Sequence, residues 1–307
     1  MMKMKTAEKV KTYELKGFRE KFIGSENPLQ QLFKSNSDHF FCLKLEEIMQ
    51  LQYPVPPSKH VCHTLLFITS GIHIINLGFE EYKTLPCEII VVPAGQIFSI
   101  EDINSNYQGY ICQLHPDILI SKYGNRETLH DFDFLKIWGN PKISVPEKDF
   151  PFITNLLNRL EAEYLKTETV NLDLIQSYLM ALFCEMNINA IKTSKNTAAA
   201  HVISARFREL IYAGIKTNHQ VNYYADQLNI TPNHLNKSVK STTGKSAAKW
   251  IEETILLEAK YLLFQTTLSI SEIAMQVGHE DHSYFSRFFK KHEGITPIQY
   301  RKLIDKS

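Results

Sequence analysis

The chain has 307 residues, of which 44% are hydrophobic, so it is long enough to bury the cores of two domains. Its formal net charge of +1 conceals an asymmetry: residues 1–200 hold 20 Lys and Arg against 23 Asp and Glu, whereas residues 201–307 hold 14 against 10. Five cysteines without CxxC spacing argue against a zinc or disulfide framework. The sequence shows no signal peptide and no apolar stretch near the roughly 20 residues of a membrane span. Composition therefore predicts a cytoplasmic protein with reduced thiols, and the basic C-terminal third suits contact with nucleic acid.

A strand-rich domain is predicted after a Lys-rich N-terminal arm over residues 1–37. The candidate strands are Phe40–Leu45, His63–Thr69, Ile72–Leu77, Glu88–Val92, Ile97–Ile100 and Tyr107–Gln113. Many short strands separated by turn residues are typical of a β-sandwich or a small barrel, and such barrels commonly enclose a small ligand.

Side chains that could bind a metal occur in this domain, the candidates being His60, His63, His115, Cys62 and Cys112. Nothing in their spacing requires a metal, and no histidine lies near Pro93–Phe98 to complete a set. Histidines held by hydrogen bonds in an apolar interior are the simpler interpretation, so we expect neither a metal nor a cofactor.

Two amphipathic helices are predicted after a connector over residues 116–146. Their apolar stripes consist of Phe152, Ile153, Leu156, Leu157, Leu160 and Tyr164, and of Leu172, Ile175, Leu179, Leu182, Phe183 and Met186. Neither helix can bury its stripe alone, so packing within the chain and dimerisation both fit the pattern. Small polar residues over 191–200 then predict a linker between a domain over 38–190 and a domain over 201–307.

The stretch Ser269–Lys290 predicts two short helices joined by a tight turn. Ser269 and Glu272 form a capping box, Gly278 ends the first helix and Asp281 can cap the second. The apolar side of the second helix consists of Phe285, Phe288 and Phe289, and its other face carries His282, Ser283, Ser286, Arg287 and Lys290. Such a donor-rich face is what reading of the DNA major groove requires, while an ordinary solvated face is the plainer alternative.

The chain builds this unit twice, which favours the DNA-reading interpretation. A first copy over residues 221–244 has a helix start at Thr231-Pro232 and turns outward Asn233, Asn236, Lys237 and Lys240. Matching residues lie 49 positions apart before the turn and 50 after it, the pairs being Ala225 and Ala274, Leu235 and Phe285, Lys237 and Arg287, Lys240 and Lys290, and Gly244 and Gly294. One residue is therefore inserted in the second turn. A helix over residues 246–265 joins the copies, and the spacing that it sets would have to match one DNA turn of ~34 Å.

Several segments in fixed order resemble the AraC/XylS family of bacterial transcription regulators. They are Glu258-Ala-Lys-Tyr-Leu-Leu, Ser269-Ile-Ser-Glu-Ile-Ala, Val277-Gly-His-Glu-Asp, Ser283-Tyr-Phe-Ser-Arg-Phe-Phe-Lys-Lys and Gly294-Ile-Thr-Pro-Ile-Gln-Tyr-Arg301. The resemblance covers about residues 202–304. It implies an α+β multidomain protein, with a cupin-like β-barrel or sandwich and flanking helices, and a C-terminal all-α domain of seven helices with two helix-turn-helix motifs. The chain departs from the family at His279, where an aromatic is frequent, at Ile255, where arginine is common, and at Lys237, where arginine is usual.

The combined expectation is a sequence-specific DNA-binding transcription regulator without enzymatic activity. The resemblance implies a homodimer and a small-molecule effector in the N-terminal domain, with RNA polymerase as a partner if the protein is an activator. A cupin-type metal enzyme with an incidental DNA-binding domain is the alternative. We expect base contacts from His282, Ser283, Ser286, Arg287, Asn233, Asn236 and Lys237, with Arg287 foremost because its fork matches guanine O6 and N7. Phosphate contacts are expected from Lys240, Lys290, Lys291 and Arg301.

Overall fold

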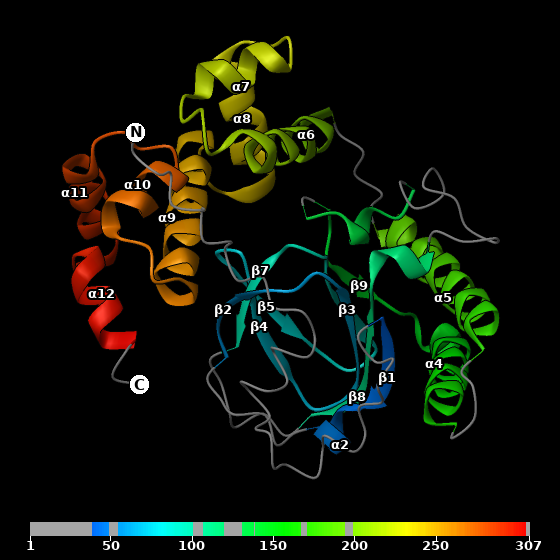
Figure 1. Cartoon of the computed structure of the whole chain (residues 1–307). Coiled ribbons are helices and arrows are strands. Elements are labelled where there is room, and N and C mark those ends of the chain that lie inside the picture. The colour runs from blue at the N-terminus through cyan, green and yellow to red at the C-terminus, as the bar shows by residue number, and fades with distance from the viewer. Residues whose placement is uncertain are drawn as a thin grey trace. The chain divides into compact units, whose positions relative to one another are not determined.

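The computed structural model describes residues 39–48, 55–100, 107–119, 131–137, 139–166, 171–193 and 199–304. These residues form two compact units, a β-rich unit up to residue 193 and an all-helical unit from residue 199 (Figure 1). The predicted N-terminal arm lies outside the described residues. Of the predicted linker over residues 191–200, residues 191–193 continue one helix and residues 199–200 begin the next, and the remaining five lie outside the described residues.

Two antiparallel sheets make up the β-rich unit. The described strands are β1 (Phe40–Lys44), β2 (Val55–Lys59), β3 (His63–Ser70), β4 (His73–Leu77), β5 (Glu80–Thr84), β6 (Glu88–Val92), β7 (Ile97–Ile100), β8 (Gln108–Leu114) and β9 (Lys142–Ser144). One sheet has the order β1-β8-β3-β6-β9 and the other the order β2-β7-β4-β5. The described strands therefore form a sandwich and not a closed barrel, which decides between the two forms that the strand pattern allowed.

All six predicted strands are present, but β2, β5 and β9 were not predicted. Each of these three lies at the edge of a sheet. The sequence of β2 contains Pro56 and Pro57, β5 is mostly charged or polar, and β9 has three residues. Edge strands tolerate proline and charge because one side of their backbone has no strand to pair with, so they lack the apolar alternation of a central strand.

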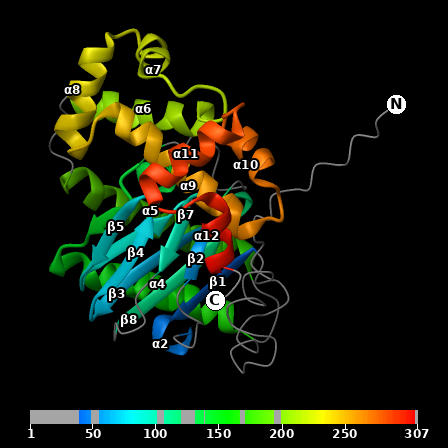
Figure 2. The same ribbon diagram turned by 90° about the vertical axis from the view of Figure 1, so that its left-hand side faces the viewer.

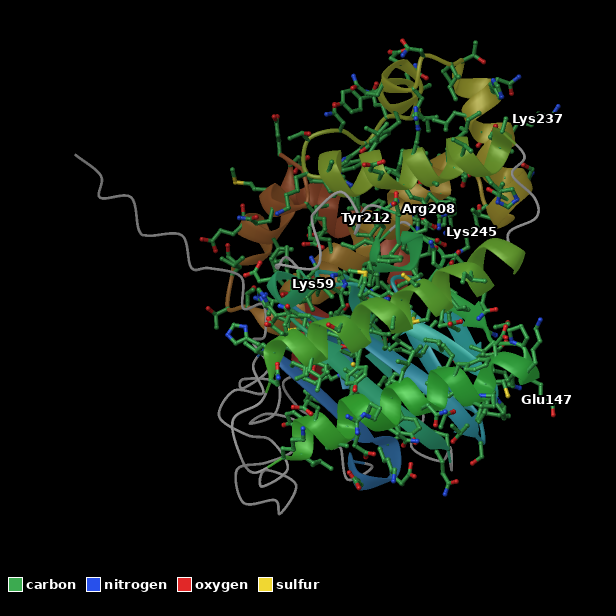
Figure 3. All side chains as sticks on the ribbon, turned by 90° about the vertical axis from the view of Figure 1, so that its right-hand side faces the viewer. Lys59, Glu147, Arg208, Tyr212, Lys237 and Lys245 are labelled. Carbon is green, nitrogen blue, oxygen red and sulfur yellow. The ribbon has the colours of Figure 1, made fainter. Side chains whose placement is uncertain are left out.

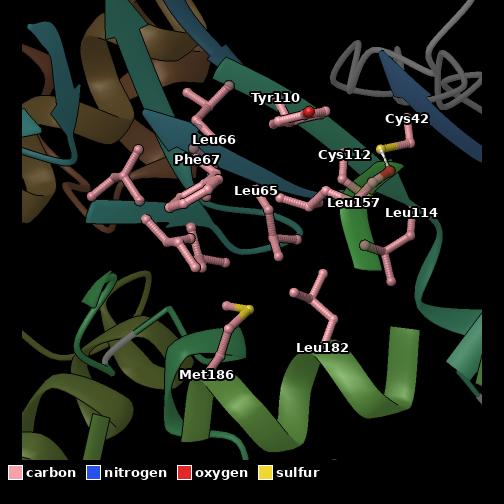
Figure 4. Close-up of a cluster of buried hydrophobic side chains, with 14 of the residues drawn as sticks. Cys42, Leu65, Leu66, Phe67, Tyr110, Cys112, Leu114, Leu157, Leu182 and Met186 are labelled. Atoms are coloured by element: carbon pink, nitrogen blue, oxygen red, sulfur yellow. Dashed lines mark hydrogen bonds between the residues drawn. The ribbon is translucent and has the colours of Figure 1, made fainter. Parts of the chain in front are cut away.

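Helices cover one face of the five-stranded sheet. They are α4 (Phe150–Leu165), which packs on β1, and α5 (Leu172–Thr193), which packs on β9; the unit also contains the short helices α2 (Leu45–Ile48), η2 (Pro116–Leu119), η3 (Asp133–Leu135) and η4 (Glu147–Asp149). Figure 4 shows side chains of this layer, where the Cys42 thiol donates to the Leu157 carbonyl at 3.7 Å.

The apolar stripes of α4 and α5 are buried inside the unit. The buried residues are Ile153, Leu157, Leu160, Tyr164, Ile175, Leu179, Leu182, Phe183 and Met186. Packing within the chain therefore accounts for both stripes, and dimerisation is not needed to bury them. Phe152 and Leu172 were wrongly included, because they are 58% and 51% exposed on the outer sides of the helices.

Buried histidines lie within the sandwich. The His60 Nδ1 atom lies 3.1 Å from Gln113 Nε2. The His60 ring also packs edge-on against Phe98, so His60 joins the two sheets. The Nδ1 atom of His63 accepts a hydrogen bond from the Ala94 N–H at 3.1 Å. Both therefore make the hydrogen bonds that the simpler interpretation predicted. Among the described residues, no three His, Cys, Asp or Glu side chains come together as a metal site would require.

Seven helices are described in the second unit. They are α6 (Ala199–Gly214), α7 (Val221–Gln227), α8 (Pro232–Thr243), α9 (Ala247–Gln265), α10 (Ile270–Gln276), α11 (His282–Glu293) and α12 (Pro297–Ile304). The α9 helix packs against α7 and α8 and against α10 and α12 (Figure 1, Figure 2). It is the joining helix predicted over residues 246–265, and we call it the rod. A search of the described helices for a segment with the length and hydropathy of a membrane span finds none.

We predict that acid destabilises the β-rich unit through its buried histidines. Burial lowers the pKa of His60 to about 3 and the pKa values of His63 and His73 to about 4, from 6.5. Between pH 6.5 and 4 the unfolded chain therefore binds protons that the folded chain does not. The free energy of unfolding should fall as the pH drops through this window, on the order of 1–2 kcal/mol for each imidazole at pH 5.

Hydrogen exchange of the strand amides at pH 7.5 and pH 5, corrected for intrinsic exchange rates, measures this loss. A His73→Gln variant should lose less protection than the wild type over the same interval. Equal protection at both pH values in the wild type would contradict the assignment.

Candidate nucleic-acid interface

The first helix-turn-helix unit, here the first head, consists of α7, α8 and their turn (residues 221–244). The Thr231 hydroxyl accepts a hydrogen bond from the His234 N–H at 3.2 Å and so caps α8. The helix ends after 12 residues at Gly244, whose φ is +74°. Glycine adopts this left-handed conformation with the least strain, and it stops the helix.

The second helix-turn-helix unit, here the second head, consists of α10, α11 and their turn (residues 269–294). The predicted capping box is present, since Ser269 and Glu272 bond to each other's backbone N–H groups. Asp281 caps α11 by accepting from the Ser283 N–H at 2.7 Å. The α11 helix also has 12 residues and ends at Gly294, with φ +77°. The two heads are therefore built on the same plan.

The turns differ by one residue, as predicted. Residues 228–231 join α7 to α8, whereas residues 277–281 join α10 to α11. The left-handed position of the first turn is Asn229, with φ +54°, and that of the second is Gly278, with φ +82°. The first turn therefore has a side chain at this position, and the second turn has none.

The outer face of α11 is exposed and polar. Its exposed side chains are His282, Ser283, Tyr284, Arg287, Lys290 and Lys291, with Ser286 half-buried. On the opposite side, Phe285 and Phe289 are fully buried. The structure therefore brings the residues predicted for the second head onto one accessible face.

The outer face of α8 matches that of α11 in position but not in chemistry. Asn233, Lys237 and Lys240 are exposed, and Leu235 and Val239 are fully buried behind them. The Lys237 side chain points away from the body of the helical unit (Figure 3). The equivalent residues of α11 are Ser283, Arg287 and Lys290, so each head presents two cations at the same positions.

Asn236 was predicted to contact bases, but its side chain makes a hydrogen bond within the protein. Its Oδ1 accepts a hydrogen bond from the Ala247 N–H at 3.0 Å, so it caps the first turn of α9. The equivalent pair in the second head is Ser286 and Pro297. Because proline has no N–H, Ser286 has no such capping role there. The same position is therefore structural in the first head and free of that role in the second.

Arg301 also differs from its predicted role as a phosphate contact. Its guanidinium donates to the Leu263 carbonyl at 3.3 Å through Nε and to the Leu268 carbonyl at 2.6 Å through Nη1. These carbonyls belong to the end of α9 and to the connection between α9 and α10. Arg301 thus satisfies carbonyls at a helix C-terminus and anchors α12, and its half-buried position makes it a structural residue.

Charge pairing separates the outer faces of the heads from the rest of the helical unit. Away from these faces, Lys245 pairs with Glu253 at 2.9 Å and Lys260 with Glu293 at 2.6 Å. In the described part of the chain, no ion pair involves the outward cations Lys237, Lys240, Arg287, Lys290 or Lys291. The two helices are built on the same plan, and their cations outside ion pairs are suited to contact DNA phosphates.

Two exposed residues beside the outer faces were missed by the sequence reasoning. His234 and Tyr284 occupy equivalent positions, 50 residues apart, three residues before Lys237 and Arg287. Tyr284 is 54% exposed and its ring lies 5.4 Å from that of His279. Because residues three apart are neighbours on a helix surface, this spacing was the available signal.

Comparisons with known proteins find transcription regulators that are similar to this chain. A family model described as a helix-turn-helix domain matches residues 224–303. The HTH-type transcriptional activator RhaR of Mannheimia succiniciproducens is 25% identical over 260 residues, covering 81% of this chain and 88% of that protein. The Msm operon regulatory protein of Streptococcus mutans is 30% identical over 126 residues, covering 41% and 45%. The solved C-terminal domain of the response regulator yesN from Fusobacterium nucleatum is 31% identical, covering 31% of this chain and 93% of that domain, with a TM-score of 0.30.

We predict that Lys290→Ala changes the salt dependence of DNA binding and not the stability, and that Arg301→Ala does the reverse. Lys290 is exposed and unpaired, so its loss should leave the melting temperature unchanged and lower the slope of log K against log salt by about one. Loss of the Arg301 hydrogen bonds should destabilise the helical unit by about 1–3 kcal/mol and leave that slope unchanged. DNA titrations at several salt concentrations and thermal unfolding measure both. A reduced slope for Arg301→Ala without loss of stability would restore its phosphate role.

Proposed function

We propose that the chain is a DNA-binding transcription regulator of the AraC/XylS family and that its two heads bind successive major grooves on one face of double-stranded DNA. The observation that carries this proposal is the repeated geometry. Two exposed 12-residue helices with unpaired cations at equivalent positions are attached to one rod. The α9 rod has 19 residues, about 28 Å at 1.5 Å per residue, which is close to the rise of one DNA turn.

The second head supplies most of the sequence specificity in this proposal. Arg287 can make a bidentate contact to guanine, which the single ammonium of Lys237 cannot. Ser283, Ser286 and His282 add hydrogen-bonding groups around it. In the first head Asn236 is engaged with α9, so Asn233 remains as the amide suited to adenine. Lys240, Lys290 and Lys291 hold phosphates and set the register.

We predict that Arg287→Ala weakens binding to the cognate site by about 1–3 kcal/mol and relaxes specificity at one base pair. Arg287→Lys is the matched variant, because it keeps the charge and removes the fork. It should retain affinity for unrelated DNA while losing discrimination at that base pair. Competition binding with every single-base variant of the site measures this. Equal losses on cognate and scrambled DNA would identify Arg287 as a phosphate contact.

Selection of bound duplexes from a random pool tests the proposed function directly. The full chain should recover sites with two conserved elements separated by about one helical turn, ~10.5 base pairs. Recovery of a single short element, or of no enriched sequence, would overturn bipartite reading. Repeating the selection with extracted metabolites present also tests whether a small molecule changes the result.

We further propose that the sandwich interior binds a small effector with apolar and hydrogen-bonding parts. His73 and Thr84 are paired across β4 and β5, and they are 1% and 0% exposed. The His73 Nδ1 and the Thr84 hydroxyl have no hydrogen-bond partner. The His73 ring packs edge-on against Tyr107 at 4.9 Å. Buried polar groups normally find partners, so these two atoms are candidates to bind a ligand.

We predict that a metabolite exists that raises the melting temperature of the wild-type chain but not that of a His73→Phe, Thr84→Val variant. The variant keeps an aromatic ring at position 73 and the branched shape at position 84, and it removes the two hydrogen-bonding groups. A thermal-shift screen followed by DNA titration of each hit measures the effect. If no compound shifts either melting temperature or DNA affinity, the effector proposal fails.

Activation of transcription as a homodimer completes the proposal. The relative RhaR is named an activator, which supports activation with RNA polymerase as partner. Phe152, Leu172 and Ile188 of α4 and α5 are 58%, 51% and 49% exposed and would be covered in a dimer. Light scattering on the purified chain tests the dimer, because a monomeric mass at micromolar concentration would contradict it.

A further inference from the structure

The connection that leads into the first head contacts the turn of the second head, in addition to the α9 helix that both heads share. His219 lies in the connection between α6 and α7, which leads into the first head. Its Nε2 is 2.9 Å from the Ile215 carbonyl oxygen and 3.0 Å from the carbonyl oxygen of Val277, in the turn of the second head. Because both neighbours are acceptors, this nitrogen carries the proton and donates to both. His219 therefore ties the entrance of the first head to the turn of the second.

The His219 ring also packs on His279, with 4.7 Å between the ring centroids. His279 contacts the rings of Tyr284, Phe285 and Phe288 within the second head. Burial and the nearby His219 lower the pKa of His279 to about 4, so it packs as a neutral ring at physiological pH. The contact thus extends into the core behind α11.

Gly278 makes this close approach possible. A Cβ atom at this position would lie 2.7 Å from His219 Nε2 and 2.7 Å from the Lys216 carbonyl oxygen. The left-handed φ of +82° would strain a side chain as well. Gly278 is therefore required both for the turn and for this contact. The other left-handed glycines at the ends of the outer helices, Gly244 and Gly294, would place a Cβ in open space.

Both sides of the contact are anchored. On the side of the first head, the Tyr224 hydroxyl donates to the Asn218 carbonyl at 2.7 Å, and the fully buried Tyr224 ring packs against Phe207 of α6. On the side of the second head, the His279 N–H donates to the Ala274 carbonyl at 2.8 Å. Because both segments are held in place, the contact fixes their position relative to each other. We call residues 215–219 and 277–279 the bracket.

We propose that the bracket, with His219 as its positioning residue, fixes the spacing and angle between the two heads and so determines which separation of DNA elements the protein accepts. This inference rests on the proposed two-headed reading of DNA. A rod joined to the heads at its two ends leaves them free to twist by small amounts. A second connection removes that freedom, and DNA elements displaced by one base pair, a rotation of about 34°, then fit poorly.

The test uses the selected duplex and derivatives with one base pair inserted or deleted between its elements. Wild type should lose about tenfold or more in affinity for either derivative. His219→Ala should reduce this penalty to about threefold or less, while binding to a duplex with the second element alone is unchanged. His219→Gln, whose amide can still donate to the Val277 carbonyl, should recover part of the penalty.

Gly278→Ala and Gly294→Ala form the matched pair. Both place alanine at a similar left-handed φ, but only Gly278→Ala forces the bracket apart. Gly278→Ala should lose the spacing penalty and Gly294→Ala should keep it, with thermal unfolding showing how much folded protein each sample contains. If wild type shows the penalty and His219→Ala keeps it in full, the bracket proposal is wrong. If wild type itself shows no dependence on spacing, the two-headed reading fails and the bracket with it.

Discussion

Burial of α9 is the constraint on which the helical unit depends. Of its 19 residues, 11 are buried, among them Trp250, Ile255 and Tyr261. A helix that is apolar around so much of its surface is stable only when other elements cover it. Helices α7 and α8 cover it from the first head, and α10 and α12 from the second half of the unit. The same packing therefore stabilises the rod and attaches both heads to it.

The two heads share a backbone plan but differ in chemistry. Caps, helix lengths and terminal glycines repeat, so the outward positions are geometrically equivalent. At one such position Asn236 caps α9 at Ala247, whereas the equivalent of Ala247 in the second head is Pro297, which has no N–H for Ser286 to cap. At another, the first head has Lys237 and the second head has Arg287. A duplicated scaffold therefore permits one head to specialise in sequence discrimination and the other to contribute affinity.

Local signals in the sequence predicted most of the fold of the helical unit. Capping residues such as Ser269 and Asp281 act within one helical turn, so a short window contains the whole interaction. The strands β2, β5 and β9 were missed because two prolines in β2, the polar residues of β5 and the three-residue length of β9 leave no apolar alternation to detect. The exposure of Phe152 was missed because the apolar stripe of a helix does not show which of its residues contact the sheet.

Contacts between distant residues explain the errors at the candidate site. The exposed cations of α8 and α11 could be placed from helical periodicity. The roles of Asn236 and Arg301 could not, because their partners, Ala247 and the carbonyls of Leu263 and Leu268, come into reach only when the helices pack. The same holds for His219, whose partner Val277 is 58 residues away. Polar residues of this kind look alike in sequence whether they face DNA or another helix.

Hydroxyl-radical footprinting of the full chain on its selected duplex tests the central claim most directly. Two heads on one rigid rod should protect two segments of each strand, centred about 10.5 base pairs apart on one face of the helix. A single protected segment, or two segments displaced by half a helical turn, would contradict the account.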